Sequence, residues 1–182
     1  MKKISFTILL AGISILTFSQ EKETTLKKEI ISVDIGFLGT WINYERHLKG
    51  LFTLKSQLGL EGGFGTSDII GVNTYFAFIP TIRAEPRYYY NFNRRVIKEK
   101  KTLFNSADYF AVTVAYYPDL FIIANVPDLS FESGVYLIPK WGMQRTIGQR
   151  INFQFAFGAG VFFGKFNTGS SFGLDIRFGY NF

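Results

Sequence analysis

Apolar and polar residues alternate one by one along most of this chain, and this period of two constrains the fold more than any other feature. In the clearest stretch, Gln149 to Phe163, apolar residues at odd positions alternate with small or polar residues at most even positions. The alternation recurs in eight segments, at residues 31–37, 40–48, 52–64, 74–90, 107–117, 134–144, 149–163 and 171–182. Because successive side chains of a strand point to opposite faces, each segment predicts a β-strand with one apolar and one polar face.

The number and length of the predicted strands indicate a membrane barrel. A tilted strand crosses an outer membrane with about 9 to 11 residues, and an even number of strands returns the chain to its starting side. Phe (21), Tyr (10) and Gly (18) are abundant, as in outer-membrane barrels. We predict an all-β fold, an eight-stranded antiparallel up-and-down transmembrane β-barrel. A soluble β-sandwich and a secreted lipocalin-like carrier, suggested by the sequence LGTW at 38–41, are the alternatives.

Residues 1–19 do not share this alternation. Two lysines precede an apolar run from Ile4 to Phe18, and small residues come shortly before Gln20. This layout is typical of a secretory signal peptide, and the run is shorter than the roughly 20 residues of a membrane-spanning helix. We expect a signal peptide at 1–19, a periplasmic leader at 20–29 and a barrel domain at 30–182, exported to an outer membrane.

Composition excludes several classes of chemistry. The chain has no cysteine and a single histidine, His47, so disulfides and thiol catalysis are excluded, as are most zinc ligand sets. The formal net charge of +6 includes the two lysines of the expected signal peptide, and the remainder is too modest to indicate a nucleic-acid partner. We expect a monomer without cofactor or metal site.

The charged residues indicate which strand face points inward. An eight-stranded interior is only just wide enough for side chains to fill, so the large aromatic face fits better outside, against lipid. Inside, five cations and five anions can pair with one another. We predict a lumen charge network formed by Asp34, Glu45, Lys55, Glu61, Arg83, Glu85, Arg87, Lys140, Asp175 and Arg177. We interpret it as a structural plug, with an ion path as the alternative.

The last strand carries the most specific resemblance. With its ending SFGLDIRFGYNF, the chain resembles the small eight-stranded outer-membrane β-barrel superfamily of Gram-negative bacteria, of OmpA/OmpX-like shape, over essentially the whole mature length. The stretches EPRYYYNFNRR and NSADYFAV are also similar to a block in such barrels. The resemblance implies that Phe178, Tyr180 and Phe182 form an assembly signal read by the barrel-assembly machinery, and that outer-membrane lipid surrounds the barrel.

The segments between strands sort into two sides. We place periplasmic turns at 47–51, 93–105 and 145–149, and outer loops near Gly39 and at 65–73, 118–130 and 164–170. The segment 93–105 is long for a periplasmic turn, and its basic residues Arg94 to Lys101 either contact anionic partners or are simply solvated.

Two further features of these segments and strands leave alternatives open. The apolar run Leu120 to Ala124 marks either a partner site or a strand extension. Pro80, Pro86 and Pro139 fall inside strands, where we expect bulges or positions near a rim.

His47, two residues from Glu45, is the one candidate for histidine-based catalysis. The predicted topology places it near the periplasmic end of the second strand, away from the outer leaflet. We therefore expect no catalytic residue, and a non-enzymatic structural, adhesive or ligand-contacting role through the extracellular loops. An outer-leaflet lipid-modifying barrel enzyme is the alternative.

Overall fold

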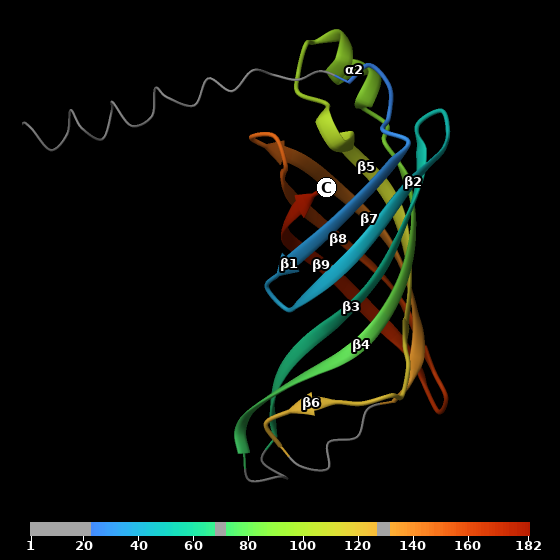
Figure 1. The fold of residues 1–182 in the computed structure, drawn as a ribbon. Helices are drawn as coiled ribbons and strands as arrows, with labels where there is room; N and C mark the ends of the chain where they lie inside the picture. Colours follow the sequence, from blue (N-terminus) through green and yellow to red (C-terminus); the bar gives the residue numbers. More distant parts are fainter. Residues whose placement is uncertain (1–22, 68–71, 127–131) are drawn as a thin grey trace, which may run out of the picture.

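The computed structural model describes residues 23–67, 72–126 and 132–182, which form a closed β-barrel (Figure 1). The wall is made by β1 (Glu29–Gly36), β2 (Gly39–Lys49), β3 (Phe52–Ser67), β4 (Val72–Tyr88), β5 (Asp108–Tyr117), β7 (Gly134–Ile147), β8 (Ile151–Gly164) and β9 (Thr168–Asn181). A short additional strand, β6 (Ile123–Ala124), pairs with β4. Two short helices, α2 (Phe92–Ile97) and η1 (Leu103–Asn105), lie between β4 and β5.

The wall strands follow one another in chain order, and each neighbouring pair is antiparallel. The first and last strands close the wall, with Ser32–Gly36 of β1 opposite Arg177–Asn181 of β9. The predicted eight-stranded antiparallel up-and-down barrel is confirmed, and β6 is an addition to it. None of the helices in the described residues has the length and apolar character needed to cross a membrane.

Polarity is distributed in the opposite sense to that of a water-soluble barrel. Phe52, Leu58, Phe110, Phe157 and Leu174 are among the many large apolar side chains that are more than half exposed on the outer face. The inner face carries the buried charged and amide side chains. This division follows directly from the period-two alternation, since each strand sends one set of side chains outward and the other inward.

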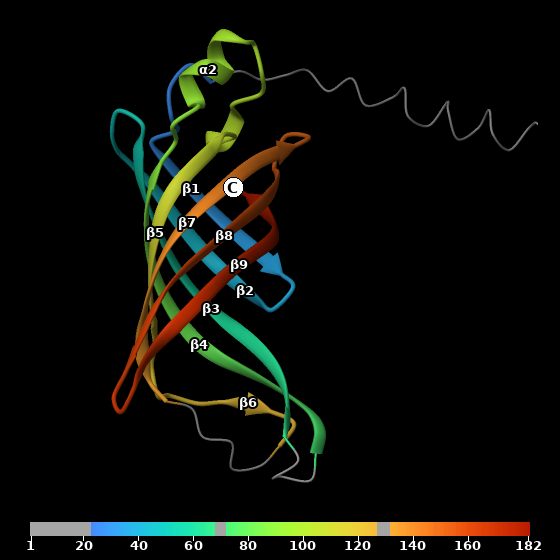
Figure 2. The same ribbon diagram turned by 180° about the vertical axis from the view of Figure 1, so that it is seen from behind.

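The two ends of the barrel are built differently (Figures 1 and 2). One end, the α2 end, carries α2, η1 and the turns that join β2 to β3 and β7 to β8. The other, the β6 end, carries β6 and the far ends of β3, β4, β8 and β9. The β1–β2 turn lies between the two ends, because these two strands are much shorter than β3 and β4.

The apolar core lies at the α2 end, where the segment 91–106, the α2 cap, folds over the barrel. Phe92 and Tyr89 pack with Leu26 and Tyr109 in one buried cluster, and Leu103 and Phe104 pack with Ile30 in a second. The backbone of Phe104 and Asn105 turns inward with φ of 50° and 60°, a left-handed conformation. The long segment predicted as a periplasmic turn at 93–105 is therefore an ordered cap.

The three prolines inside the strands do not produce the expected bulges. The β4–β5 ladder keeps one register on both sides of Pro86, and the β7–β8 ladder does so around Pro139. The missing N–H groups interrupt these ladders locally without shifting them. Pro80 lies in the middle of β4 and pairs with Leu60 of β3 without a shift of register.

Candidate functional site

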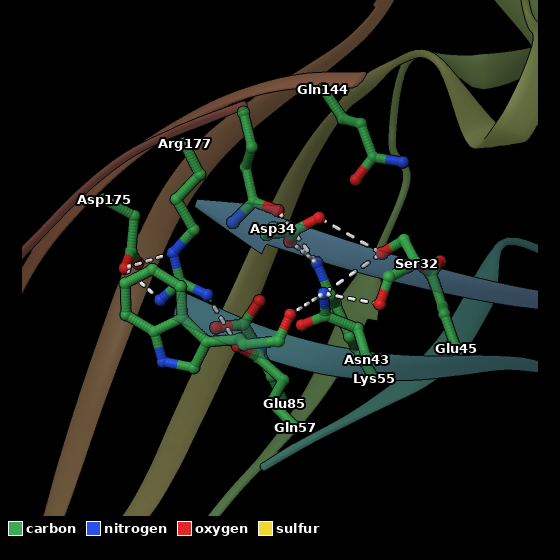
Figure 3. Close-up of polar contacts among 12 residues, drawn as sticks. Ser32, Asp34, Asn43, Glu45, Lys55, Gln57, Glu85, Gln144, Asp175 and Arg177 are labelled. Carbon is green, nitrogen blue, oxygen red and sulfur yellow. Dashed lines mark hydrogen bonds and ion pairs between the residues drawn. The ribbon is translucent and has the colours of Figure 1, made fainter. Parts of the chain in front are cut away.

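The ten charged residues predicted for the lumen all lie on the inner face of the barrel. Nine of them are buried, and the side chain of Arg83 is 11% exposed. Their contacts form one connected set, shown in part in Figure 3. Lys55 binds Asp34 at 3.0 Å and the side-chain oxygen of Gln154 at 3.1 Å, and that same oxygen accepts a bond from Arg87 at 3.1 Å. Gln154 thus joins two ion pairs that do not touch directly.

Arg87 is the centre of the half of the lumen nearest α2. The side chain is fully buried, and its Nε donates to Glu85 at 2.7 Å while Nη1 donates to Gln144 at 3.0 Å. Its guanidinium also lies 4.2 Å from the ring centroid of Tyr109, a cation–π contact. The planar, five-donor guanidinium explains why an arginine can link so many partners at one point.

Glu45 connects the lumen to the α2 cap. One of its carboxylate oxygens accepts hydrogen bonds from Tyr89 and from Asn105, both at 2.9 Å. Gln144 on the wall also donates to the backbone oxygen of Phe104 in the cap, at 2.8 Å. The cap therefore fills the α2 end with side chains that bond directly to the charge network.

In the cap, outside the strands, the pKa of the Arg95 guanidinium is shifted by its surroundings. Arg95 of α2 donates to the backbone oxygen of Lys101 at 2.9 Å. Burial lowers the pKa of Arg95, and the nearby charge of Arg145 lowers it further. At neutral pH the group stays protonated, since the usual pKa of arginine is above 12.

The β6 half of the network is organised around Asp175. This carboxylate contacts three cations, Lys140, Arg177 and Arg83, and its distance to Arg83 is 3.4 Å. Asp34 binds Lys55 instead. Arg177 stands opposite Gly36 in the strand register, and its Nη1 donates to Gln57 at 2.7 Å.

Trp41 stands at the boundary of the β6 half. Its Nε1 donates to Glu61 at 2.7 Å, and the guanidinium of Arg177 lies 3.6 Å from its ring. The ring fits inside the barrel because its neighbour on β3 is a glycine: a Cβ added at Gly59 would come within 2.4 Å of the indole. The LGTW motif thus places its tryptophan in a charged lumen.

Beyond Trp41 the lumen opens into a cavity of about 580 Å³ at the β6 end. This volume lies within the range of small-molecule sites, about 300–1,000 Å³. We call the charged residues of its lining, which belong to the lumen network, the cavity floor; most of the other lining residues are apolar. Its lining includes Phe37, Leu38, Trp41, Glu61, Gly63, Ile79, Arg83, Tyr136, Ile138, Lys140, Ser171, Phe172, Leu174, Asp175 and Arg177.

The apolar run at Leu120 to Ala124 divides between two roles. Ile123 and Ala124 form β6 and pair with Phe78 and Ala77 of β4, which extends the sheet at this end. Ile122 lines the cavity, and Leu120 and Phe121 stay exposed. Two residues of the run therefore form a separate short strand, and the run does not extend β5, which ends at Tyr117.

The remaining sequence candidates lie away from this cavity. His47 lies at the α2 end, close to the end of β2, with Nε2 2.9 Å from the carbonyl oxygen of Gly50. Phe178, Tyr180 and Phe182 are about half exposed on the outer face of β9, and the N–H of Phe182 donates to Ile31. Within the ranges that the structure describes, no group of three or more His, Cys, Asp or Glu side chains is placed to hold a metal ion.

The sequence prediction of the network included only its charged residues and left out the neutral side chains that connect them. Gln154, Gln144, Gln57 and Asn105 are each at most 2% exposed and bridge the charged groups or the cap. Gln154, Gln144 and Gln57 stand at inward positions of their strands, so the period of two would have located them. Asn105 lies in the cap, outside any strand, and has no such pattern.

Comparisons of this chain with protein-family models, with curated proteins and with solved structures find no match. The fold and the lumen by themselves define the class of protein. It is a closed eight-stranded antiparallel β-barrel with an apolar outer face and a charged interior.

Proposed function

We propose that this chain is an integral outer-membrane barrel with a plugged lumen and a non-enzymatic role, structural or ligand-contacting, at its outer end. The observation that carries the proposal is the inverted polarity: large apolar side chains cover the outside of every wall strand, while ten charges lie inside. In water, an apolar outer surface of this extent favours association. In a bilayer, the same surface is solvated by lipid chains.

The aromatic side chains at the α2 end support this interpretation. Tyr88, Tyr90 and Tyr180 are partly exposed there, and Trp141 donates to the hydroxyl of Tyr90 at 3.0 Å. Such amphipathic rings concentrate where a barrel meets the headgroups. We place the α2 end in the periplasm, following the proposed export by a signal peptide, and the outward residues Phe178, Tyr180 and Phe182 would serve recognition by the assembly machinery.

A plugged lumen follows from charge balance and packing. The five cations and five carboxylates neutralise one another, and removing water from ions is tolerated only when they are paired and hydrogen-bonded. The cap fills the α2 end, where Asn105 and Tyr89 bond to Glu45. A steady ion current would need a hydrated path through these contacts.

The charged lumen also weighs against a lipocalin-like carrier. Such a carrier keeps its apolar ligand in the barrel interior, so it needs its apolar face inside. Here Trp41 of the LGTW motif contacts Arg177 and Glu61, and the apolar face is outside.

Fractionation of cells that produce the full chain tests the membrane proposal. We expect the protein in the outer-membrane fraction, soluble only in detergent, and with an electrophoretic mobility that changes on heating. A protein that stays soluble without detergent would refute it.

Two measurements test the other parts of the proposal. Planar-bilayer recordings should show no steady conductance, and a stable, selective current would overturn the plug. The lipid profile of a deletion strain should be unchanged, whereas the loss of a modified outer-leaflet lipid would support the enzyme alternative.

A further inference from the structure

The barrel wall is incomplete on one side of the β6 half. The short β1–β2 hairpin ends at Phe37 and Leu38, where the N–H of Phe37 donates to Ile176 of β9 and Leu38 accepts from Gly62 of β3. Past these bonds, residues 168–175 of β9 and 63–67 of β3 have no partner strand on this side within the described part of the chain. Figure 2 shows β9 and β3 diverging beyond the hairpin.

The cavity lies behind this gap in the wall. Residues of both gap edges line it, Leu174 and Phe172 on β9 and Gly63 on β3, and the hairpin tip contributes Phe37. Phe37, Phe172 and Leu174 are 79%, 85% and 67% exposed. They form an apolar rim, and they continue the outward apolar row of β9 that includes Ile176. A mouth bordered in this way faces lipid chains when the barrel is in a bilayer.

The cavity floor favours an anionic group. Among the residues that line the cavity, Arg83, Lys140 and Arg177 stand against two carboxylates, Glu61 and Asp175, and all three cations contact Asp175. Lys140 also pairs at 3.4 Å with Glu85, which does not line the cavity. The buried Nε–H of Arg83 has no hydrogen-bond acceptor among the described residues. A buried donor without a partner costs free energy, about 1–3 kcal/mol, which a ligand oxygen would recover only if Arg83 turns this N–H into the cavity.

We propose that this cavity takes up a single-chain amphiphile with an anionic headgroup, of the fatty-acid class, which enters sideways from the bilayer between β9 and β3. The headgroup meets Arg83 and Lys140 at the floor, and the hydrocarbon chain passes Ile79 and Ile138 to the apolar rim. This inference rests on the proposed membrane insertion. A soluble polar ligand fits less well, because the gap opens among lipid-facing side chains.

The two tryptophans provide a direct test, since Trp41 lines the cavity whereas Trp141 lies on the outer face between Phe110 and Phe157. A Trp141→Phe protein in phosphatidylcholine vesicles reports Trp41 alone. We expect a fatty acid brominated at its chain end to quench this fluorescence saturably. A phosphatidylcholine brominated in both chains, which is too bulky for the cavity, should leave it largely unquenched.

A matched pair of glycine substitutions separates binding in the cavity from contact with the bilayer. A Cβ added at Gly63 or at Gly169 meets no atom within 4 Å, but only Gly63 lines the cavity. In the Trp141→Phe background, Gly63→Phe should remove most of the saturable quenching, and Gly169→Phe should retain it.

Each failure has a separate meaning. Unsaturable quenching of Trp41, or quenching that survives Gly63→Phe, would overturn the cavity proposal alone. In a Trp41→Phe protein, the remaining Trp141 should be quenched by the brominated phosphatidylcholine. If it is not, and if the protein does not float with the vesicles, the membrane proposal itself is wrong.

Discussion

The two halves of the lumen contain the same kinds of charge but use them differently. In the α2 half, Arg87 and Glu45 are saturated by partners from the wall and from the cap, and Arg87 is fully buried. In the β6 half, Arg83 and Asp175 border a cavity, and the Nε–H of Arg83 has no acceptor among the described residues. The α2 half is a closed polar core, whereas the charged residues of the β6 half line part of an open cavity.

The difference shows what decides whether a charged barrel interior is structural or able to bind. Both halves have inward charges at strand spacing, so alternation alone does not distinguish them. Both halves have neutral partners, Gln144 and Gln154 in one and Gln57 and Trp41 in the other. Only the α2 half has a cap, whose Asn105 bonds to Glu45. In the β6 half, the short β1–β2 hairpin ends before β3 and β9 do, which leaves a gap in the wall and room for a ligand.

The largest expected effect comes from removing the centre of the closed half. Arg87→Met leaves Glu45 buried without a cation and leaves Glu85 with Lys140 alone, at 3.4 Å. Breaking a buried pair in this way costs about 3–5 kcal/mol. Unfolding by guanidinium in phospholipid vesicles measures the change in free energy. Lys98→Met, at an exposed position of the cap, is the control and should be within about 0.5 kcal/mol of the parent protein.

Detaching the cap should have the next largest effect. Asn105→Ala removes the bond to Glu45 and the bond that its Oδ1 accepts from the N–H of Lys27, and it places alanine at a φ of 60°. We expect a loss of about 2–4 kcal/mol from the unsatisfied groups and the left-handed backbone together. Asn93→Ala, exposed in the same cap, serves as the control in the same unfolding measurement. An equal response of the two variants would show that the cap does not stabilise the barrel.

The same substitution in the open half should cost less. Arg83→Met also removes a cation from two carboxylates, Glu61 and Asp175, but Asp175 keeps Lys140 and Arg177, and water can enter the cavity. We expect about 1–2 kcal/mol, between the values typical of exposed and of buried pairs. A loss as large as that of Arg87→Met would erase the distinction between the halves.

The smallest effect on stability should come from filling the cavity itself. Gly63→Phe places a ring in open space, and we expect the free energy of unfolding to change by less than about 0.5 kcal/mol. A large destabilisation in the vesicle unfolding measurement, with Gly169→Phe unchanged, would show that the space at Gly63 is already occupied in the folded protein.

Much of the fold could be predicted because alternation is a local property of the sequence. The strand from Gln149 to Phe163 shows it most clearly, and the structure places β8 at Ile151–Gly164. The inward positions of Lys55, Glu85 and Arg177 followed from the same period. The bulges predicted at Pro86 and Pro139 were wrong. A missing N–H was expected to shift the strand register, whereas the hydrogen bonds on either side of each proline keep it unchanged.

The rest depends on contacts between residues far apart in the sequence. The cap closes the α2 end because Asn105 reaches Glu45 across the barrel, and no periodicity in residues 93–105 indicates this. The lateral gap exists because β1 and β2 stop while β3 and β9 continue, which is a difference of strand lengths across the closure. Neither feature is visible in one segment alone.

The absence of native cysteine allows the central claim, one filled half and one open half, to be measured directly. Ser171 lines the cavity, whereas Ser32 is 3% exposed in the α2 half. Single Ser171→Cys and Ser32→Cys proteins, folded in vesicles, would be treated with a water-soluble maleimide. We predict rapid labelling at position 171 and none at position 32 until the protein is unfolded. Equal labelling of the two folded proteins would contradict the account.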